Sequence, residues 1–285
     1  MRIIDGKLVA ASIRGGIADE VANLRKKGLE DGIGLAVIFV GDNPASQVYV
    51  RNKIKACEEV GIESFLCKLP EDSTFEDVAD TIRELNGNKD VSGIILQLPI
   101  PAHLDENKLI DLISPEKDVD GCTAAQKGRL WTGRDSLIAC TPFGVMKLLE
   151  YYGIPLEGKN AVVIGRSNLV GKPMAQLLLD ANCTVTVCHS RTQNLAEITR
   201  RADIVVVAIG KAKFLKADMI KEGAIVVDVG MDRDENGKLC GDVDFNAICE
   251  KCKYITPVPG GVGPMTVTML ISNTLKAYKK QHGIA

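Results

Sequence analysis

The chain has 285 residues, of which 46% are hydrophobic and 25% are charged, and its formal net charge at pH 7 is −2. This is the composition of a globular protein, and it gives no support to a nucleic-acid-binding or membrane-surface role. Charges or glycines interrupt every apolar run before it could span a bilayer, and Asp5 and Lys7 stand where a signal peptide would have its apolar core. We therefore expect a cytoplasmic protein, with a length that suits two modest domains.

The nine cysteines are expected to be reduced thiols in that compartment. Cys249 and Cys252 form one C-x-x-C pair, but no second pair accompanies it. Two thiols near a helix end are therefore the simpler interpretation. With three histidines in the whole chain, we expect no metal site.

Helix and strand patterns alternate along the chain, which is typical of parallel α/β architecture. The first half predicts a strand at 34–41, a helix at 43–61, a weaker strand at 62–69, a helix at 74–86 and a strand at 92–101. The second half predicts helices at 141–153 and 265–280 and strands at 160–164, 184–188, 203–208, 224–229 and 254–257.

These elements predict two α/β lobes around a cleft, the second a Rossmann-like doubly wound parallel sheet. We expect residues 1–140 to form an N-terminal catalytic domain, joined by a returning C-terminal helix at 266–285. Residues 141–265 are expected to form the nucleotide-binding domain.

The stretch VVIGRSNLVGKP at 162–173 runs from a strand through a glycine turn into a helix. Gly165 permits the sharp turn and Gly171 permits close packing of helix on strand, two requirements of a dinucleotide site. The second glycine of the usual fingerprint is missing, because Arg166 and Ser167 follow Gly165. On this segment alone, a plain structural turn is an equally good interpretation.

The end of the next strand favours NADP as the cofactor. An NAD site has an acidic residue there for the ribose hydroxyls, whereas this chain has His189, Ser190 and Arg191. A carboxylate would repel a 2′-phosphate, while arginine and serine hydrogen-bond to it. Arg166 adds a second guanidinium at the neighbouring turn. The alternative is that both arginines are merely solvated loop residues.

A second candidate site lies in the first half. Tyr49, Lys53, Ala56 and Val60 follow helical spacing and share one stripe of the helix at 43–61. A lysine in such a stripe either snorkels to the surface or is a functional group in a cleft. A desolvated ammonium has a lowered pKa and exchanges protons near neutrality.

Other polar residues stand where ligands bind. Gln97 ends a parallel strand, at the edge where such sheets bind ligands. Asp118 and Asp120 lie on a loop, either as turn formers or as partners for a flat ring that carries an amine. The segment TPVPGGVGPMT at 256–266 follows a strand, and its glycines let the main chain approach a ligand closely, although a linker is the alternative.

Several of these segments together resemble one family. They are GDNPASQVYVRNK, LQLPIP, PEKDVDG, CTPFGV, GRSNLVGKPMAQLLL, ITPVPGGVGPMTVTML and SNT, in the family's order over nearly the whole chain. They are similar to the bifunctional methylenetetrahydrofolate dehydrogenase/methenyltetrahydrofolate cyclohydrolase family. The resemblance implies a homodimer that passes a hydride from 5,10-methylenetetrahydrofolate to NADP⁺ and then hydrolyses the methenyl product to 10-formyltetrahydrofolate.

The resemblance also implies roles for individual residues. Lys53 matches the lysine that assists proton movement, Gln97 the glutamine that hydrogen-bonds that lysine, and Tyr49 the tyrosine that packs on the folate. Asp120 matches the carboxylate that binds the amino edge of the pterin. The remaining matches are the folate-pocket wall at Pro259, Gly260 and Gly261, the NADP loop at Gly165, Arg166 and Ser167, and a cofactor contact at Met231.

Two segments depart from the family pattern. Cys122 and Thr123 stand where Phe-His is common, and AAQKGRL at 124–130 replaces a usual Asn-Val-Gly run. Both lie beside Asp120, so a dehydrogenase with little cyclohydrolase activity stays an alternative. From other classes, a non-catalytic NADP-binding regulator and an amino-acid dehydrogenase are also considered. A proton-shuttle lysine does not suit the first, and the PVPGGVGPMT segment does not suit the second.

Overall fold

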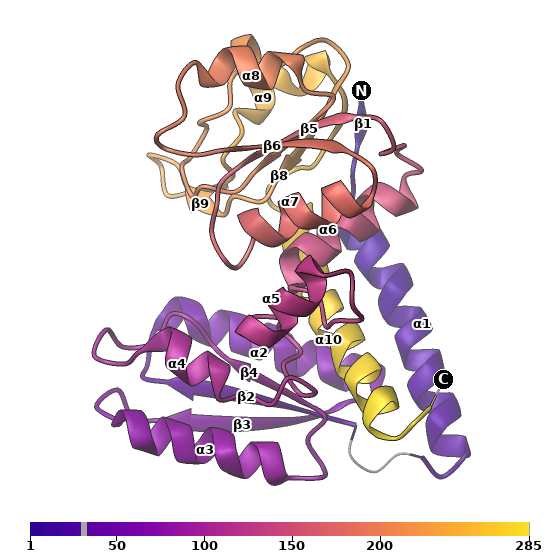
Figure 1. Cartoon of the computed structure of the whole chain (residues 1–285), viewed down its shortest axis with the longest axis vertical. Coiled ribbons are helices and arrows are strands. Elements are labelled where there is room, and N and C mark those ends of the chain that lie inside the picture. The colour runs from indigo at the N-terminus through magenta and orange to yellow at the C-terminus, as the bar shows by residue number, and fades with distance from the viewer. Residues whose placement is uncertain (30–32, 285) are drawn as a thin grey trace. The chain divides into compact units, whose positions relative to one another are not determined.

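The computed structural model describes residues 1–29 and 33–284, which form two compact α/β units (Figure 1). One unit comprises residues 12–140 and 267–285, and the other comprises residues 1–11 and 141–266. The first eleven residues therefore belong with the second half of the chain, contrary to the sequence expectation. The reason is that strand β1 (Arg2–Ile3) pairs in parallel with β11 (Cys252–Ile255).

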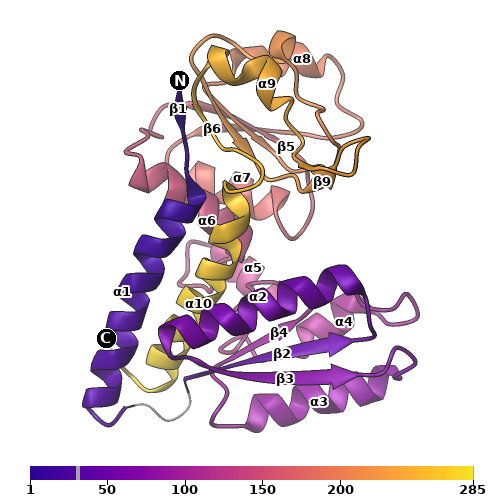
Figure 2. The same cartoon turned by 180° about the vertical axis from the view of Figure 1, so that it is seen from behind.

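The unit built on residues 12–140 contains a three-stranded parallel sheet in the order β3–β2–β4. Its strands are β2 (Gly34–Val40), β3 (Glu63–Leu69) and β4 (Gly93–Leu96). Its shorter helices are α2 (Pro44–Val60), α3 (Phe75–Gly87), α4 (Glu106–Asp111) and α5 (Ala124–Trp131). Figures 1 and 2 show α2 on one face of the sheet and α3 and α4 on the other. All seven residues of β2 are buried, as a central strand covered on both faces requires.

The other unit contains a six-stranded parallel sheet in the order β1–β11–β8–β7–β5–β6. Its remaining strands are β5 (Asn160–Ile164), β6 (Thr184–Cys188), β7 (Ile204–Val207) and β8 (Ala224–Asp228). Helix α7 (Gly171–Asp180) covers one face, and α8 (Leu195–Arg201) and α9 (Phe245–Ile248) cover the other (Figure 1). Strand β6 lies on one side of β5 and strand β7 on the other, so the strand order reverses between β5 and β7. Doubly wound sheets bind their ligands at such a point.

The remaining elements are two long helices, α1 (Gly6–Lys26) and α10 (Val262–Gln281), the helix α6 (Cys140–Tyr151), and the small hairpin of β9 (Asp232–Arg233) and β10 (Leu239–Cys240). Helices α1 and α10 each continue from one unit into the other. Among the described residues, no helix is long and apolar enough to cross a membrane.

The predicted strands and helices named above are all present, and the predicted fold class is confirmed. Most boundaries differ from the sequence expectation by two residues or fewer, and two differ by more. Strand β4 ends at Leu96 rather than at 101, because Pro99 and Pro101 cannot donate to a ladder. Helix α10 starts at Val262 rather than at 265, since Pro264 in its first turn lacks an N–H that would be unpaired there in any case.

Candidate functional site

Lys53 lies in the middle of α2 and is buried, with 9% of its surface exposed. Its Nζ donates to Oε1 of Gln97 at 2.8 Å, and Gln97 is equally buried, just beyond the end of β4. Nε2 of Gln97 donates to the carbonyl of Leu98, which fixes the amide so that its oxygen faces the lysine. Burial lowers the pKa of Lys53, and the nearby charge of Asp120 opposes that shift.

The loop that carries Asp120 is held from two directions. The buried carboxylate of Asp118 accepts from the backbone N–H groups of Cys122 at 3.1 Å and Thr123 at 2.7 Å. Nδ2 of Asn273, on α10, donates at 2.8 Å to the carbonyl of Val119 and, also at 2.8 Å, to the carbonyl of Ile138. Burial raises the pKa of Asp118, against the pull of its two backbone donors. Asp120 is thereby placed by its neighbours on both sides.

Two cysteine thiols lie near the carboxylate of Asp120. Sγ of Cys122 lies 3.5 Å from Oδ2 of Asp120, and Cys140 is buried nearby and donates to the carbonyl of Val119. Burial, with a further contribution from the charge of Asp120, raises the pKa values of both thiols well above the ordinary value. They are therefore neutral near pH 7 and are weak donors rather than nucleophiles.

Tyr49 lies one helical turn before Lys53 on α2, and 40% of its surface is exposed. The predicted stripe is present, because Lys53, Ala56 and Val60 are buried along the same face. The ring at the head of this face is partly exposed, as stacking on a flat molecule requires.

The turn after β5 has the shape that a dinucleotide site needs. Gly165 has φ of 129°, and a Cβ there would lie 2.3 Å from the carbonyl oxygen of Ala208, at the end of β7. A Cβ on Gly171, the first residue of α7, would lie 2.3 Å from the carbonyl oxygen of Gly165. Only glycine fits at either position, so the strand, the turn and the helix approach as closely as the fingerprint requires.

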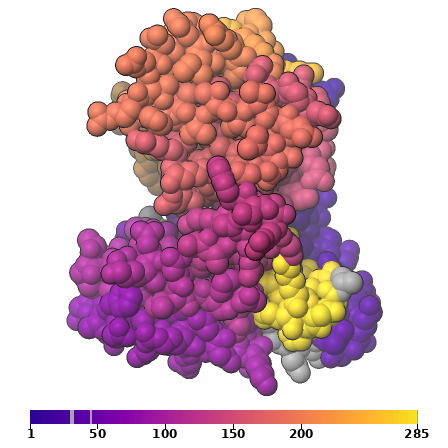
Figure 3. All heavy atoms as spheres, viewed as in Figure 1, coloured from indigo at the N-terminus to yellow at the C-terminus, as the bar shows by residue number. Residues whose placement is uncertain are grey.

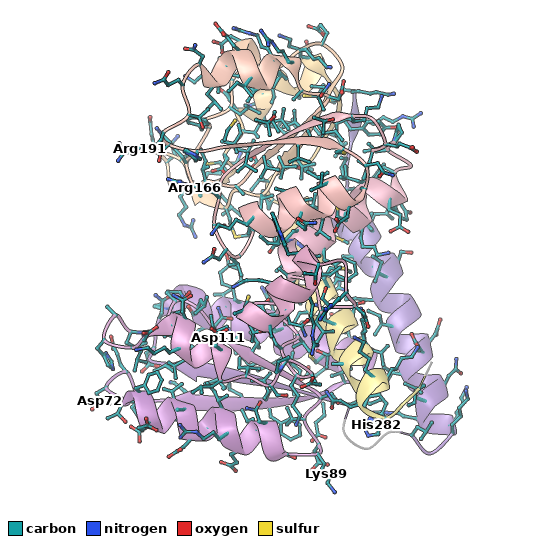
Figure 4. All side chains as sticks on the ribbon, in the orientation of Figure 1. Asp72, Lys89, Asp111, Arg166, Arg191 and His282 are labelled. Carbon is teal, nitrogen blue, oxygen red and sulfur yellow. The ribbon has the colours of Figure 1, made fainter. Side chains whose placement is uncertain are left out.

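The polar residues expected to bind the cofactor are exposed: Arg166, Ser167, Ser190 and Arg191. The N–H of Gly165 donates to the carbonyl of Cys188, so the loops after β5 and β6 begin side by side. Figure 4 shows Arg166 and Arg191 at the same edge of this unit. No carboxylate occurs among residues 188–194, so nothing in that loop repels a phosphate. The chain's own residues therefore fit NADP.

The remaining predicted residues follow other strands of the same sheet. Met231 comes three residues after β8 and is 47% exposed, and a Cβ on Gly263 would lie 3.3 Å from its Cε. Pro259, Gly260 and Gly261 follow β11, and the carbonyl of Gly260 accepts from the N–H of Gly6 at 2.9 Å. They belong to the unit with the six-stranded sheet, whereas Lys53, Gln97 and Asp120 belong to the other unit.

Asn273 and Cys140 were not predicted as site residues. An asparagine close to the apolar run at 269–271 was a usable signal, because a buried amide must find hydrogen-bond partners. Asp118 was weighed only as a turn former or a ring partner, and its actual contacts are with the backbone of its own loop.

Two sequence models of the tetrahydrofolate dehydrogenase/cyclohydrolase family match the chain. The catalytic-domain model matches residues 4–120, and the NAD(P)-binding-domain model matches residues 139–282. The chain belongs to this family.

Individual members of the family are similar over nearly their full length. The "Bifunctional protein FolD" of Campylobacter hominis is 56% identical over 99% of this chain and 98% of its own. The bifunctional FolD enzyme from Campylobacter jejuni superposes with a TM-score of 0.96 at 49% identity, covering 99% of both chains. A Trypanosoma brucei member, solved with NADP cofactor and an inhibitor, superposes with a TM-score of 0.94 at 39% identity, covering 98% of both chains.

Proposed function

We propose that this protein oxidises 5,10-methylenetetrahydrofolate to 5,10-methenyltetrahydrofolate with NADP⁺ and then hydrolyses that product to 10-formyltetrahydrofolate. Membership of the family and the similarity to bifunctional relatives support both activities rather than a dehydrogenase alone. The buried Lys53–Gln97 pair is the observation that carries the second activity. Hydrolysis needs a group that accepts and returns a proton near neutral pH, and an amine with a lowered pKa does so.

The six-stranded sheet holds the cofactor in this proposal, and NADP⁺, when bound, supplies the hydride acceptor. The guanidinium groups of Arg166 and Arg191, with the hydroxyls of Ser167 and Ser190, bind its 2′-phosphate. Gly165 lets the backbone approach the pyrophosphate. The T. brucei relative solved with NADP supports this choice of cofactor.

The folate is held by flat and polar groups in the proposal. Tyr49 stacks on the ring system, the carboxylate of Asp120 accepts from the amino edge of the pterin, and residues 259–261 are also folate-binding residues. No nucleophile is needed for hydride transfer, because the protein's part is to orient two flat rings face to face.

In the hydrolysis, a water oxygen bonds to the cationic methenyl carbon and must lose a proton. Lys53, in its neutral form, accepts that proton and returns it to the ring nitrogen as the carbon–nitrogen bond breaks. The remaining hydroxyl proton passes to solvent as the carbonyl of the formyl group forms on the other nitrogen. Oε1 of Gln97 accepts a hydrogen bond from Lys53 in either protonation state, so the lysine keeps its place through the cycle.

The test is an absorbance time course with 5,10-methylenetetrahydrofolate, run in parallel with NADP⁺ and NAD⁺. We expect rapid formation of NADPH, slower formation of NADH, and decay of the methenyl product faster than in a protein-free control. NADPH formation with no acceleration of methenyl decay would leave a dehydrogenase alone. No reaction with either cofactor would refute the proposed function.

We also propose that the protein is a homodimer and works in the cytoplasm. Strand β6 is an edge of the six-stranded sheet, and Val187 on it and Leu179 on the neighbouring α7 are 40% and 53% exposed. Figure 3 shows one face of this unit with its side chains filled in. An exposed edge strand with apolar side chains favours pairing with a second copy. Light scattering is expected to give twice the 30.7 kDa chain mass for the wild type and a lower mass for Val187→Lys.

The cytoplasmic proposal rests on a different observation. All nine cysteines of the chain are free thiols, which stay reduced in that compartment. Fractionation of cells that produce the protein is expected to recover it with cytoplasmic markers, and recovery with secreted material would contradict the proposal.

A further inference from the structure

Two buried carboxylates lie near the carboxyl edge of the six-stranded sheet, outside the residues used so far. Asp228 is the last residue of β8 and is 3% exposed, and Asp242, two residues after β10, is fully buried. A buried carboxylate is destabilising unless its oxygens accept hydrogen bonds. The hydrogen-bond partners of Asp228 and Asp242 therefore indicate the role of the two residues.

Asp228 joins three segments of backbone. Its Oδ1 accepts from the N–H groups of Gly230 and Asp242, both at 2.9 Å, and its Oδ2 accepts from the N–H of Val243 at 3.0 Å. Its own N–H donates to the hydroxyl of Thr256 at 2.7 Å. One residue therefore connects the loop after β8, the segment after β10 and the first residue beyond β11.

Asp242 extends these connections to a fourth segment. Its Oδ2 accepts from the N–H groups of Ile209 at 2.7 Å and Gly210 at 3.3 Å, and its Oδ1 accepts from that of Lys211 at 2.6 Å. These are three successive backbone donors in the loop after β7. A single carboxylate satisfies them all, which fixes the path of that loop.

Two glycines allow the carboxylates to come this close to the backbone. A Cβ on Gly230 would lie 2.4 Å from the nitrogen of Asp242, and a Cβ on Gly241 would lie 2.0 Å from Oδ2 of Asp228. Neither position accepts a side chain without displacing the network. The hydrogen bonds of the two carboxylates therefore hold the backbone of loops near the carboxyl edge of the sheet, and they do not join side chains of the core.

We propose that Asp228, Asp242 and Thr256 are positioning residues that hold the loops after β7, β8 and β11 in one hydrogen-bonded frame. The loop after β8 carries Met231, and the loop after β11 carries residues 257–261, so the frame sets a cofactor-facing and a folate-facing loop together. This inference rests on the proposed function, which assigns those two loops to the two ligands.

The experiment measures binding rather than turnover, by calorimetric titration with NADP⁺ and, separately, with 5-formyltetrahydrofolate as a stable folate. Asp242→Asn replaces one carboxylate oxygen by an amide NH₂ group, which cannot accept a hydrogen bond from the backbone N–H that it faces. We expect the Kd for NADP⁺ to rise at least roughly tenfold. Asp234→Asn is the matched control, because Asp234 also accepts backbone bonds in the neighbouring hairpin but lies outside the frame. Its Kd for NADP⁺ should stay at the wild-type value.

Thr256 provides a second test with little risk to folding. Thr256→Val removes the hydroxyl that accepts from Asp228 while keeping the shape, and Thr256→Ser keeps the hydroxyl. We expect Thr256→Val to weaken binding of 5-formyltetrahydrofolate by several-fold, roughly the effect of one lost neutral hydrogen bond, and Thr256→Ser to restore it. If Asp242→Asn does not fold, this pair decides the question.

The possible results separate the two claims. Variants that melt earlier but bind both ligands with wild-type Kd values would show that the frame is merely structural and would overturn the inference. The same would follow if Thr256→Val and Thr256→Ser weakened folate binding equally. Failure of the wild type to bind either ligand would instead refute the proposed function on which the inference rests.

Discussion

The two polar sites of this protein differ in their exposure to water. Lys53 and Gln97 are buried and hydrogen-bonded to each other, whereas Arg166, Ser167 and Arg191 are exposed. Burial suits a group that must lose and regain a proton, because desolvation brings the pKa of an ammonium toward neutrality. Exposure suits a guanidinium, which stays charged at any physiological pH and needs only to meet a phosphate. The chain thus buries the residue whose pKa matters and exposes the residues whose charge matters.

The largest effect is expected where burial determines the chemistry. Lys53→Met keeps the length of the side chain without its amine, and we expect hydrolysis of 5,10-methenyltetrahydrofolate to slow by roughly 10²–10⁴-fold, as when a general base is lost. Binding of 5-formyltetrahydrofolate should persist. Stopped-flow absorbance of methenyl decay gives the rate.

Lys55→Met is the matched control for that change, because Lys55 lies two residues away on the same helix and is exposed. It should leave hydrolysis unchanged. Hydrolysis at the wild-type rate in Lys53→Met, with folate binding intact, would contradict the role of Lys53.

Asp228 is a second buried ionisable group, and it tests the effect of burial on a pKa in the unit that contains the six-stranded sheet. Burial raises the pKa of Asp228 from the ordinary 3.8 to about 7. Between those values the folded protein binds this proton and the unfolded chain does not, so the free energy of unfolding falls as pH rises from about 4 to about 7. Above about pH 7 this group contributes no further change.

The measurement is urea unfolding of the wild type and of Asp228→Asn at several pH values. We expect the wild type's free energy of unfolding, relative to the variant's, to fall by on the order of a few kcal/mol across this range. A difference that is constant with pH would mean that Asp228 has an ordinary pKa despite its burial.

For the exposed arginines, the expected effect is on cofactor choice rather than on the chemical step. Replacing Arg166 and Arg191 together by alanine removes both guanidinium groups, and we expect kcat/KM for NADP⁺ to fall by roughly 10–100-fold with little change for NAD⁺. Arg201→Ala, an exposed arginine on α8, is the control. An unchanged ratio of the two kcat/KM values would show that these arginines do not recognise the 2′-phosphate.

The smallest effect is expected from a residue that acts through its neighbours. Asn273→Leu leaves the carbonyls of Val119 and Ile138 without their buried donor, so the loop that carries Asp120 loses one of its two attachments. We expect the KM for the folate to rise several-fold and the Kd for NADP⁺ to stay constant, with a stability loss of roughly 1–3 kcal/mol. Ser272→Ala is the control, and equal changes for both ligands would indicate general loosening.

Much of the fold was predictable because the chain's local patterns agree with its tertiary structure. The apolar run at 34–41 is a strand buried on both faces, and Pro44 and Gly61 mark the ends of α2 to within a residue. The placement of residues 1–11 was not predictable, because a two-residue strand carries no pattern of its own. Only its pairing with β11, more than 200 residues away, places it in the sheet.

The site was predictable where a residue type is unusual for its position, as with Lys53 in a buried stripe and an arginine in place of an acid after β6. The residues that hold Asp120 were harder to find. Asn273 is 153 residues away from Asp120 in the chain, and its contacts are with main-chain carbonyls, which leave no trace in side-chain spacing. Asp228 and Asp242 were missed for the same reason, since their partners are backbone N–H groups.

The central claim is that burial and the bond to Gln97 keep Lys53 ready to accept a proton. It is tested most directly by an NMR pH titration of the protein with ¹⁵N-labelled lysine side chains, with Lys53 assigned from the signal missing in Lys53→Met. The account predicts that Lys53 titrates below the ordinary lysine value of 10.5. Titration of Lys53 at or above that value would contradict it.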